Sequence, residues 1–248
     1  YIRNHKLAEY LELIKESKKA CTIPVIASIN CYTDSEWIDF AKQIEEAGAD
    51  ALEINILALQ SDIQYKYGSF EQRHIDILSH IKKTIRIPVI MKLGSNFTNP
   101  VALIDQLYAN GAAAVVLFNR FYQPDIDVEK MEHTSGDVFS NASDLSATLR
   151  WIGISSSLVT KIDYAASGGI HKPDAIVKAI LAGASAIEVC SAIYQNTNLF
   201  IGEMNRFLGA WMERKGFKHI SQFKGKLNAK DAVSYTHLRA HETGAYLV

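Results

Sequence analysis

The sequence predicts an α/β fold in which six strand-then-helix units form part of a (β/α)8 barrel, the TIM-barrel fold. Three observations predict it. Short apolar segments alternate with amphipathic ones along most of the chain, as in a parallel sheet with helical crossovers. The motif Ile-Pro-Val-Ile opens two of the apolar segments, at 23–26 and 87–90. A glycine between a helix pattern and the next strand recurs at Gly48, Gly111 and Gly183, the position that favours glycine after a helix.

The strands are predicted from short apolar runs rich in β-branched residues, which are typical of strands buried on both faces. They cover residues 23–29, 51–55, 87–93, 113–118, 162–166 and 186–190. Six strands also suit an open doubly wound sheet, but the GxGxxG fingerprint of that fold is absent from the sequence. We therefore favour a barrel cut short by two units.

The helices are predicted from apolar residues at helical spacing, beginning with residues 5–19. Ser35 is the expected N-cap of the helix that ends at Gly48. The remaining helices cover 70–84, 101–109, 145–154, 173–181 and 199–215. The polar segment 57–69 and the aperiodic segment 119–143 are expected to hold no regular element.

The composition excludes several classes of protein. A net charge of -1 gives no electrostatic case for nucleic acid or an acidic membrane. No apolar run approaches the roughly 20 residues that a membrane span requires. The cysteines, Cys21, Cys31 and Cys190, are spaced neither as a disulfide framework nor as a zinc site. We expect a cytoplasmic protein with a small-molecule substrate and no metal, and leave a homodimer open.

No linker interrupts residues 1–228, so we expect one domain there, beginning partway through the barrel. The tail 229–248 is expected to lie outside the domain. Its last part lacks any helix or strand period and resembles translated adapter sequence, so we consider it artefactual. His237 and His241 in the tail have helix-face spacing, but we do not expect a metal site there.

The segment 162–191 predicts an anion site. It contains a strand, the sequence Ser167-Gly168-Gly169, a helix and a second strand that ends near Ser191. Adjacent glycines let backbone N–H groups approach an anion, and the N-terminus of the next helix adds to the attraction. Loops after the last two strands are the usual phosphate site of a (β/α)8 barrel. The alternative is a Gly-Gly loop that only turns the chain.

Polar side chains at the predicted strand ends indicate a second site. Asn30, Asn55 and Asn119 each follow or end an apolar strand, and Lys92 lies near the end of another. Amides suit the edge of a flat heterocycle, because each offers donors and an acceptor. A fixed ammonium group suits developing negative charge on a cofactor ring. The alternative for Lys92 is a salt bridge to Glu53.

Other residues are weaker candidates for a catalytic role. Cys31 is a candidate nucleophile or base, but a free cysteine is often a small buried hydrophobe. The histidines before the tail fall on expected helices or loops and are not expected to be catalytic.

The strand-end segments resemble the dihydroorotate dehydrogenase family, which comprises FMN-dependent (β/α)8 barrels. The likeness is carried by IPVIASIN, GADALEIN, IPVIMKL, VVLFNRFYQPDID, ASGGI and GFKHISQFKGKL. It covers residues 23–227 as strands three to eight of that barrel. The resemblance implies oxidation of dihydroorotate, or of a related small cyclic amide, by hydride transfer to flavin in pyrimidine biosynthesis.

The resemblance also implies roles for residues. Asn30 and Asn55 would contact the flavin, Lys92 would lie at its N1/O2 edge, and Asn55 and Asn119 would bind the substrate. The phosphate of FMN would be held by residues of the two loops, namely Ser167, Gly168, Gly169, Cys190 and Ser191.

Two departures from the family pattern concern the chemistry. The position of the usual Cys or Ser base is Ala58, so Ser61 or Cys31 would have to act as the base. The residue after Asn119 is Arg120, where the family usually has Ser. Two alternatives stay open: a non-flavin phosphate-binding lyase or isomerase with a Lys92 Schiff base, and a flavin-binding protein without dihydroorotate turnover.

Overall fold

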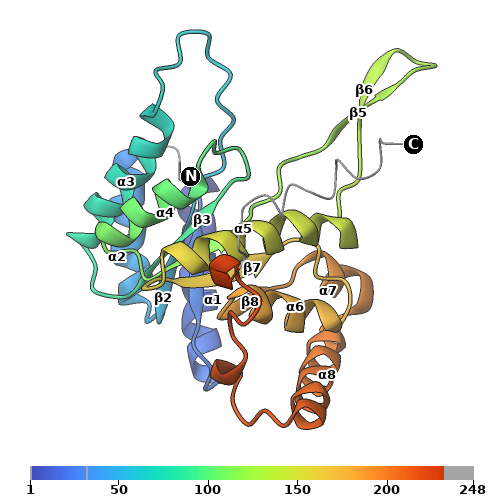
Figure 1. Ribbon diagram of the computed structural model, residues 1–248. Helices are drawn as coiled ribbons and strands as arrows, with labels where there is room; N and C mark the ends of the chain where they lie inside the picture. Colours follow the sequence, from blue (N-terminus) through green and yellow to red (C-terminus); the bar gives the residue numbers. More distant parts are fainter. Residues whose placement is uncertain (1, 32, 232–248) are drawn as a thin grey trace. The chain divides into compact units, whose positions relative to one another are not determined.

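The structure, a computed structural model, describes residues 2–31 and 33–231 (Figure 1). Its main sheet has six strands in the order β1-β2-β3-β4-β7-β8. Their bounds are β1 Ile26–Ile29, β2 Ala51–Asn55, β3 Val89–Leu93, β4 Ala114–Leu117, β7 Asp163–Ser167 and β8 Ala186–Glu188. The pairs β1–β2, β2–β3 and β3–β4 are parallel. The predicted α/β class with parallel strands is confirmed.

The chain divides into two compact units. Among the described residues, the first comprises 2–31, 33–139 and Lys161–Ala165, and the second comprises Ser140–Thr160 and 166–231. The helices of the first unit are α1 Ile2–Ala20, α2 Asp34–Glu46, α3 Ser69–Lys82 and α4 Pro100–Ala109. Those of the second are α5 Leu145–Leu158, α6 Asp174–Ala182, α7 Ser191–Asn196 and α8 Leu199–Lys215, with the short 3₁₀ helices η1 Ala142–Asp144, η2 Ile220–Gln222 and η3 Ala229–Asp231.

The core of the first unit lies where α2 packs on β2 and α3 packs on β3. Every residue of β2 except Asn55 is buried, so this strand is covered on both faces, as its apolar sequence predicts. Leu52 and Ile54 of β2 are fully buried, as are Ile44 of α2 and Leu78 of α3. This packing fixes the strands whose carboxyl ends carry the polar residues.

The second unit has a separate apolar core. It is formed by buried residues of α5, the loop after β7, α6, α7, α8 and the segment after α8, namely Leu145, Ile170, Ala175, Ile176, Val177, Ile180, Ala192, Phe200, Met204 and Phe223. Phe223 is fully buried and packs against Phe217 and Trp211, with ring centroids 5.2 and 5.0 Å away. The closing segment around Phe223 is therefore part of this core.

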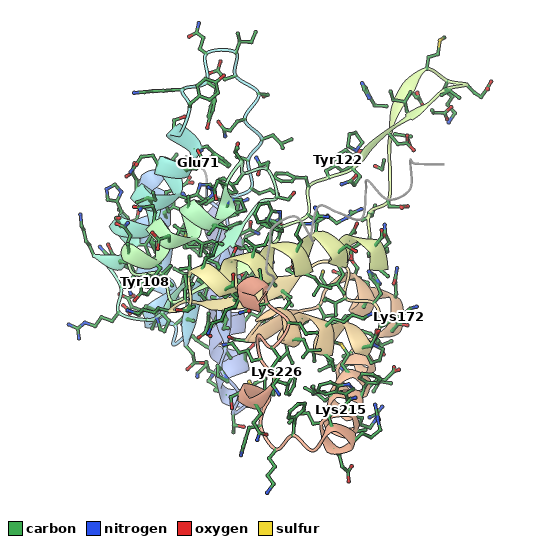
Figure 2. All side chains as sticks on the ribbon, viewed as in Figure 1. Glu71, Tyr108, Tyr122, Lys172, Lys215 and Lys226 are labelled. Carbon is green, nitrogen blue, oxygen red and sulfur yellow. The ribbon has the colours of Figure 1, made fainter. Side chains whose placement is uncertain are left out.

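The segment 119–143 departs from the prediction, because it holds an antiparallel hairpin of β5 Pro124–Asp127 and β6 Glu132–Ser135. Its strands are polar and almost wholly exposed, so they lack the apolar alternation that marks a half-buried strand. Figure 1 shows the hairpin extending away from the helices of the first unit. Tyr122 lies at its base (Figure 2), with its hydroxyl 3.0 Å from the Ser135 hydroxyl.

Several boundaries also differ from the prediction; for example, β1 begins at Ile26 rather than at residue 23, and α5 ends at Leu158 rather than at residue 154. The N-cap of α2 is Thr33 rather than Ser35, because Thr33 has extended backbone angles and its N–H donates to the Glu36 carboxylate at 3.0 Å. Strand β8 ends at Glu188 rather than at residue 190. The backbone of Cys190 is no longer extended, at φ -125° and ψ -71°, and it caps α7 instead.

Residues 229–231 of the predicted tail form η3, which packs against α5. The rest of the tail, with His237 and His241, lies outside the described residues. In the part of the chain that the structure covers, no helix is both long and apolar enough to cross a membrane.

Candidate functional site

Four adjacent strands of the first unit bring polar side chains to one end of the sheet. Asn55 is the last residue of β2, and it lies opposite Lys92 of β3 in the parallel register. Asn119 follows β4, and its backbone N–H donates to the Leu93 carbonyl at 2.7 Å, which continues the pairing of β3 with β4. Asn30 follows β1 and is exposed. The predicted strand-end cluster is thus present within one unit.

Two of the three amides of this cluster, those of Asn55 and Asn119, contact each other. The Asn119 side-chain NH2 donates a short hydrogen bond to the Asn55 side-chain carbonyl. The Asn119 side-chain carbonyl in turn accepts from the Arg120 backbone N–H at 3.0 Å. Both amides are half-buried, so they are fixed in orientation and still reach solvent. A ligand would therefore meet amides that are already oriented.

Lys92 lies beside a buried carboxylate. Its Nζ is 3.8 Å from Glu53 Oε1, and the two side chains are only 17% and 8% exposed. The same Glu53 oxygen accepts a hydrogen bond from the Ser28 hydroxyl at 2.7 Å. The salt bridge between Lys92 and Glu53, which the sequence offered as the alternative role of Lys92, is therefore present in the structure. Glu53 also acts on Tyr10 of α1: burial raises the pKa of Tyr10 above its usual value, and the charge of Glu53 raises it further.

The glycine loop of the second unit has the backbone conformation that the anion hypothesis requires. Gly168 and Gly169 follow β7 with φ of 93° and 74°, a region that strongly favours glycine. A Cβ on Gly168 would meet no heavy atom of the described residues within 4 Å, so these residues leave the space beside it open. A Cβ on Gly169 would lie 2.2 Å from the Leu145 nitrogen, so this position admits glycine alone. The Ser167 carbonyl accepts from the Thr148 hydroxyl at 3.0 Å, which fixes the start of the loop.

Two residues that the sequence did not single out lie beside this loop. The Ser191 hydroxyl accepts from the Ser140 backbone N–H at 3.1 Å. The Ser140 hydroxyl is 2.9 Å from His171 Nε2, and His171 lies two residues after Gly169. Ser140 is in the aperiodic segment, so only its distance from the loop in space identifies it. His171 could have been suspected from its place in the glycine loop.

The remaining candidates have different surroundings. Cys190 is exposed at the start of α7, and Cys31 is buried two residues after the end of β1. Ser61 is exposed on the loop 56–68, which extends beyond the start of α3 in Figure 1. Ala58, at the position of the family's base, is half-buried, and its carbonyl accepts from the Asn96 amide at 3.3 Å. Among the described residues, no group of three His, Cys, Asp or Glu is placed to hold a metal ion.

The fold and these residues define a protein of the (β/α) barrel class, in which active sites lie at the carboxyl ends of the strands. The family model for dihydroorotate dehydrogenase matches residues 3–211, and the chain belongs to the dihydroorotate dehydrogenase family. This membership confirms the resemblance inferred from the strand-end segments. Enzymes of this family are oxidoreductases that use FMN.

Curated relatives agree with the family. The chain is 26% identical over 222 residues to "Dihydroorotate dehydrogenase B (NAD(+)), catalytic subunit" of Thermoplasma volcanium, covering 88% of this chain and 71% of that protein. It is 29% identical over 220 residues to the protein of the same name from Methanosarcina mazei, with 87% and 68% covered. It is 28% identical over 245 residues to "Putative dihydroorotate dehydrogenase A (fumarate)" of Aeropyrum pernix, with 95% and 75% covered.

Within each unit taken by itself, the described residues are chemically suited to bind one part of FMN. In the first unit, amides and an ammonium group match the carbonyl and N–H edge of a flavin ring. In the second, two glycines with positive φ, open space beside Gly168 and the Ser191 hydroxyl match a phosphate. Each set supplies the donors that one part of the cofactor requires.

Proposed function

We propose that this protein is an FMN-dependent oxidoreductase that oxidises dihydroorotate, or a closely related small cyclic amide, in pyrimidine biosynthesis. The observation that carries the proposal is the cluster of Asn55, Lys92 and Asn119 on adjacent strands in a chain of this family. Bound FMN supplies a hydride acceptor. The protein's own residues bind, orient and stabilise charge.

Each side chain of the cluster has a distinct proposed role. Asn55 and Asn119 hold the cyclic amide through hydrogen bonds, because their paired amides present both donors and acceptors. Asn30 and Asn55 contact the flavin ring. The Lys92 ammonium stabilises the negative charge that reduction places on the ring, which is the electrostatic contribution expected of a fixed cation in a poorly solvated site.

The phosphate of FMN is assigned to the second unit. Gly168 and Gly169 present backbone N–H groups, while Ser167, Cys190 and Ser191 complete the set that the family resemblance implies. The hydrogen bond from Ser140 to Ser191 and the positive φ of both glycines support this assignment.

The test is an anaerobic titration of the full-length protein. A visible flavin spectrum after purification, followed by bleaching on addition of dihydroorotate, is the expected result. Lys92→Ala should abolish the bleaching, while Lys83→Ala, at the exposed end of α3, should not change it. Absence of flavin even after FMN is added would refute the proposal. Unchanged reduction kinetics in Lys92→Ala would refute the role of Lys92.

A Schiff-base lyase or isomerase is disfavoured by the pairing of Lys92. A Schiff-base lysine must be able to lose its proton, whereas a carboxylate at 3.8 Å favours the ammonium form. Borohydride in the presence of a carbonyl substrate would trap Lys92 covalently under that alternative. We expect no such adduct by mass spectrometry.

A flavin-binding protein without rapid dihydroorotate turnover is a second candidate function, favoured by Ala58 at the position of the family's base. General-base assistance is worth about 10²–10⁴-fold, so a missing base slows the loss of the substrate proton by that order. Ser61 and Cys31 are the substitutes to be tested. If neither acts, Ala58→Cys should accelerate bleaching by dihydroorotate and leave the affinity for FMN unchanged. A fast wild-type reaction that is lost in Ser61→Ala or Cys31→Ala would identify the substitute instead.

The proposal also includes the oligomeric state and the cellular compartment of the protein. We propose a homodimer in the cytoplasm. None of the three cysteines forms a disulfide, which suits a reducing compartment. Exposed apolar side chains on the hairpin, such as Val128 at 75% and Met131 at 87% exposure, support a self-association surface. Light scattering on the purified protein tests the oligomeric state.

A further inference from the structure

Glu53 is a carboxylate in an unusual place. Among the acidic side chains whose exposure the structure describes, it is the only one that is buried, at 6% exposure. Glutamate is rarely buried to this extent unless it is paired. Its Oε1 accepts from the Ser28 hydroxyl at 2.7 Å and lies 3.8 Å from Lys92 Nζ. The carboxylate thus lies between groups from the two neighbouring strands, β1 and β3.

The strand register shows which of the two charges is nearer to the strand-end amides. Glu53 is opposite Ser28 and Ile90, whereas Asn55, two residues further along the same face of β2, is opposite Lys92. Lys92 therefore starts at the level of the amide cluster, and Glu53 lies one layer below it. An effect of Glu53 on a ligand at the strand ends is expected to pass through Lys92.

Burial makes the carboxylate necessary for the charge of Lys92. The Lys92 side chain is 17% exposed, and an ammonium group in such surroundings is costly without an opposite charge. Breaking a buried ion pair by removing one partner leaves an uncompensated charge, and the remaining group then tends to neutralise. A lysine that has lost its proton cannot stabilise negative charge on a ring.

We propose that Glu53 is a positioning residue that keeps the Lys92 ammonium charged and fixed beside the flavin, with Ser28 holding the carboxylate in place. This inference rests on the proposed function, since it assigns the flavin edge to Lys92. Glu53 itself touches neither cofactor nor substrate in this assignment. It acts on the reduction potential of bound FMN through Lys92.

Titratable groups on at least three elements lie around this pair. Glu53 belongs to β2, Lys92 to β3, and Tyr10 of α1 hydrogen-bonds to the Ser28 carbonyl at 3.0 Å and senses the charge of Glu53. Strand β4 contributes Val116 opposite Lys92, which does not titrate. The Tyr10 pKa is raised from 10.0, so Tyr10 stays neutral over the range in which the experiment is done.

The experiment measures the midpoint potential of bound FMN at pH 6 and pH 8 in four proteins. Glu53→Gln should lower the potential at pH 8 and lower it less at pH 6, because acid restores the proton on Lys92. The expected decrease corresponds to at least a tenfold loss in the preference for reduced over oxidised FMN, which is about 30 mV for a two-electron couple. Lys92→Met should lower the potential at both pH values. Adding Glu53→Gln to Lys92→Met should cause no further change.

The matched control is Glu45→Gln, since the Glu45 carboxylate also accepts hydrogen bonds, from the Arg86 and Ile87 backbone N–H groups at 2.6 and 3.0 Å, but lies on α2. Its potential should equal that of the wild type. Glu53→Asp keeps the charge and should give a smaller decrease in the same direction. If Glu53→Gln does not fold, the potential measured in Glu53→Asp tests the inference instead.

Three results would overturn the inference. The first is an unchanged or raised midpoint potential in Glu53→Gln, or, if that variant is unfolded, a wild-type potential in Glu53→Asp as the second. The third is an equal change of potential on Glu53→Gln in the wild type and in Lys92→Met. Failure of the proposed function is recognised separately, because the wild type would then bind no FMN. In that case NMR of the Lys92 ε-carbon in the protein alone decides the inference. Loss of the ammonium form at pH 8 in Glu53→Gln supports it, and a retained ammonium form overturns it.

Discussion

His74 of α3 is fully buried, although histidine can carry a charge. Its Nδ1 lies 2.8 Å from the Phe70 carbonyl, which can only accept, so Nδ1 carries the proton of the neutral ring. Its Nε2 is buried and has no hydrogen-bond partner among the residues that the structure describes. The rings of Phe70 and Phe97 pack edge-on against the imidazole at 4.7 and 5.1 Å. An added proton on Nε2 would place an unpaired charge in an apolar cage.

Burial lowers the pKa of His74 from 6.5 to about 4, with the hydrogen bond to the Phe70 carbonyl opposing the change and the charge of Arg73 adding to it. The folded state therefore prefers the neutral ring. This contribution to stability is fully present above pH 6.5 and is lost as the pH falls toward 4. At 1.36 kcal/mol per pKa unit, linkage predicts a loss of about 2 kcal/mol between pH 7 and pH 5, and of about 3 kcal/mol by pH 4.

Urea denaturation of the wild type and of His74→Phe at several pH values isolates this contribution, because other groups titrate equally in both proteins. Phenylalanine suits the aromatic cage and cannot be protonated. His80, which is exposed on the same helix, provides the control variant His80→Gln. The wild type and the control should each lose about 2 kcal/mol more than His74→Phe between pH 7 and pH 5. Hydrogen exchange of the α3 amides should locate the acid-sensitive step in the first unit. An identical pH profile for wild type and His74→Phe would refute the reasoning.

Two further predictions concern backbone geometry. Gly169→Ala should prevent folding of the second unit, because its Cβ would lie 2.2 Å from the Leu145 nitrogen. In Gly168→Ala the added methyl group has space, and only the φ of 93° is unfavourable, so the free energy of unfolding should fall by about 1–2 kcal/mol. Equal losses of thermal stability in the two variants would contradict this difference. Asn99→Ala should cost about 1 kcal/mol, because the Asn99 side chain accepts from the Ala102 N–H at 3.1 Å at the start of α4; an unchanged unfolding free energy would exclude that capping role.

Some elements could be predicted to the residue because their limits are encoded locally. The strand 51–55 coincides with β2, which is apolar between a glycine-ended helix and a polar loop. The helix 199–215 coincides with α8, which ends where Gly216 adopts a φ of 73°. The hairpin β5–β6 could not be predicted in this way. Its strands are stabilised by pairing with each other across a turn, and their exposed side chains leave no periodic pattern.

The residues of the candidate site could be predicted where they lie at the end of a strand, because the strands themselves could be predicted. Asn55, Lys92 and Asn119 stand out because a polar side chain at the end of an apolar run is conspicuous in the sequence. Ser140 does not stand out, since it lies in a segment without a periodic pattern and its contact with His171 joins residues 31 positions apart. A hydrogen bond between two loops depends on the fold of the whole unit. Sequence periodicity carries no information about it.

The sequence offers two roles for Lys92 as alternatives, a salt bridge to Glu53 and a fixed charge beside a flavin. The geometry of the first unit makes them depend on each other. A lysine that is 17% exposed needs a counter-charge to remain an ammonium ion, and a lysine without charge would be of no use to a reduced flavin. A carboxylate that touched the flavin directly would oppose the same negative charge. The carboxylate therefore serves best one layer below the amides, at the place that Glu53 occupies opposite Ser28.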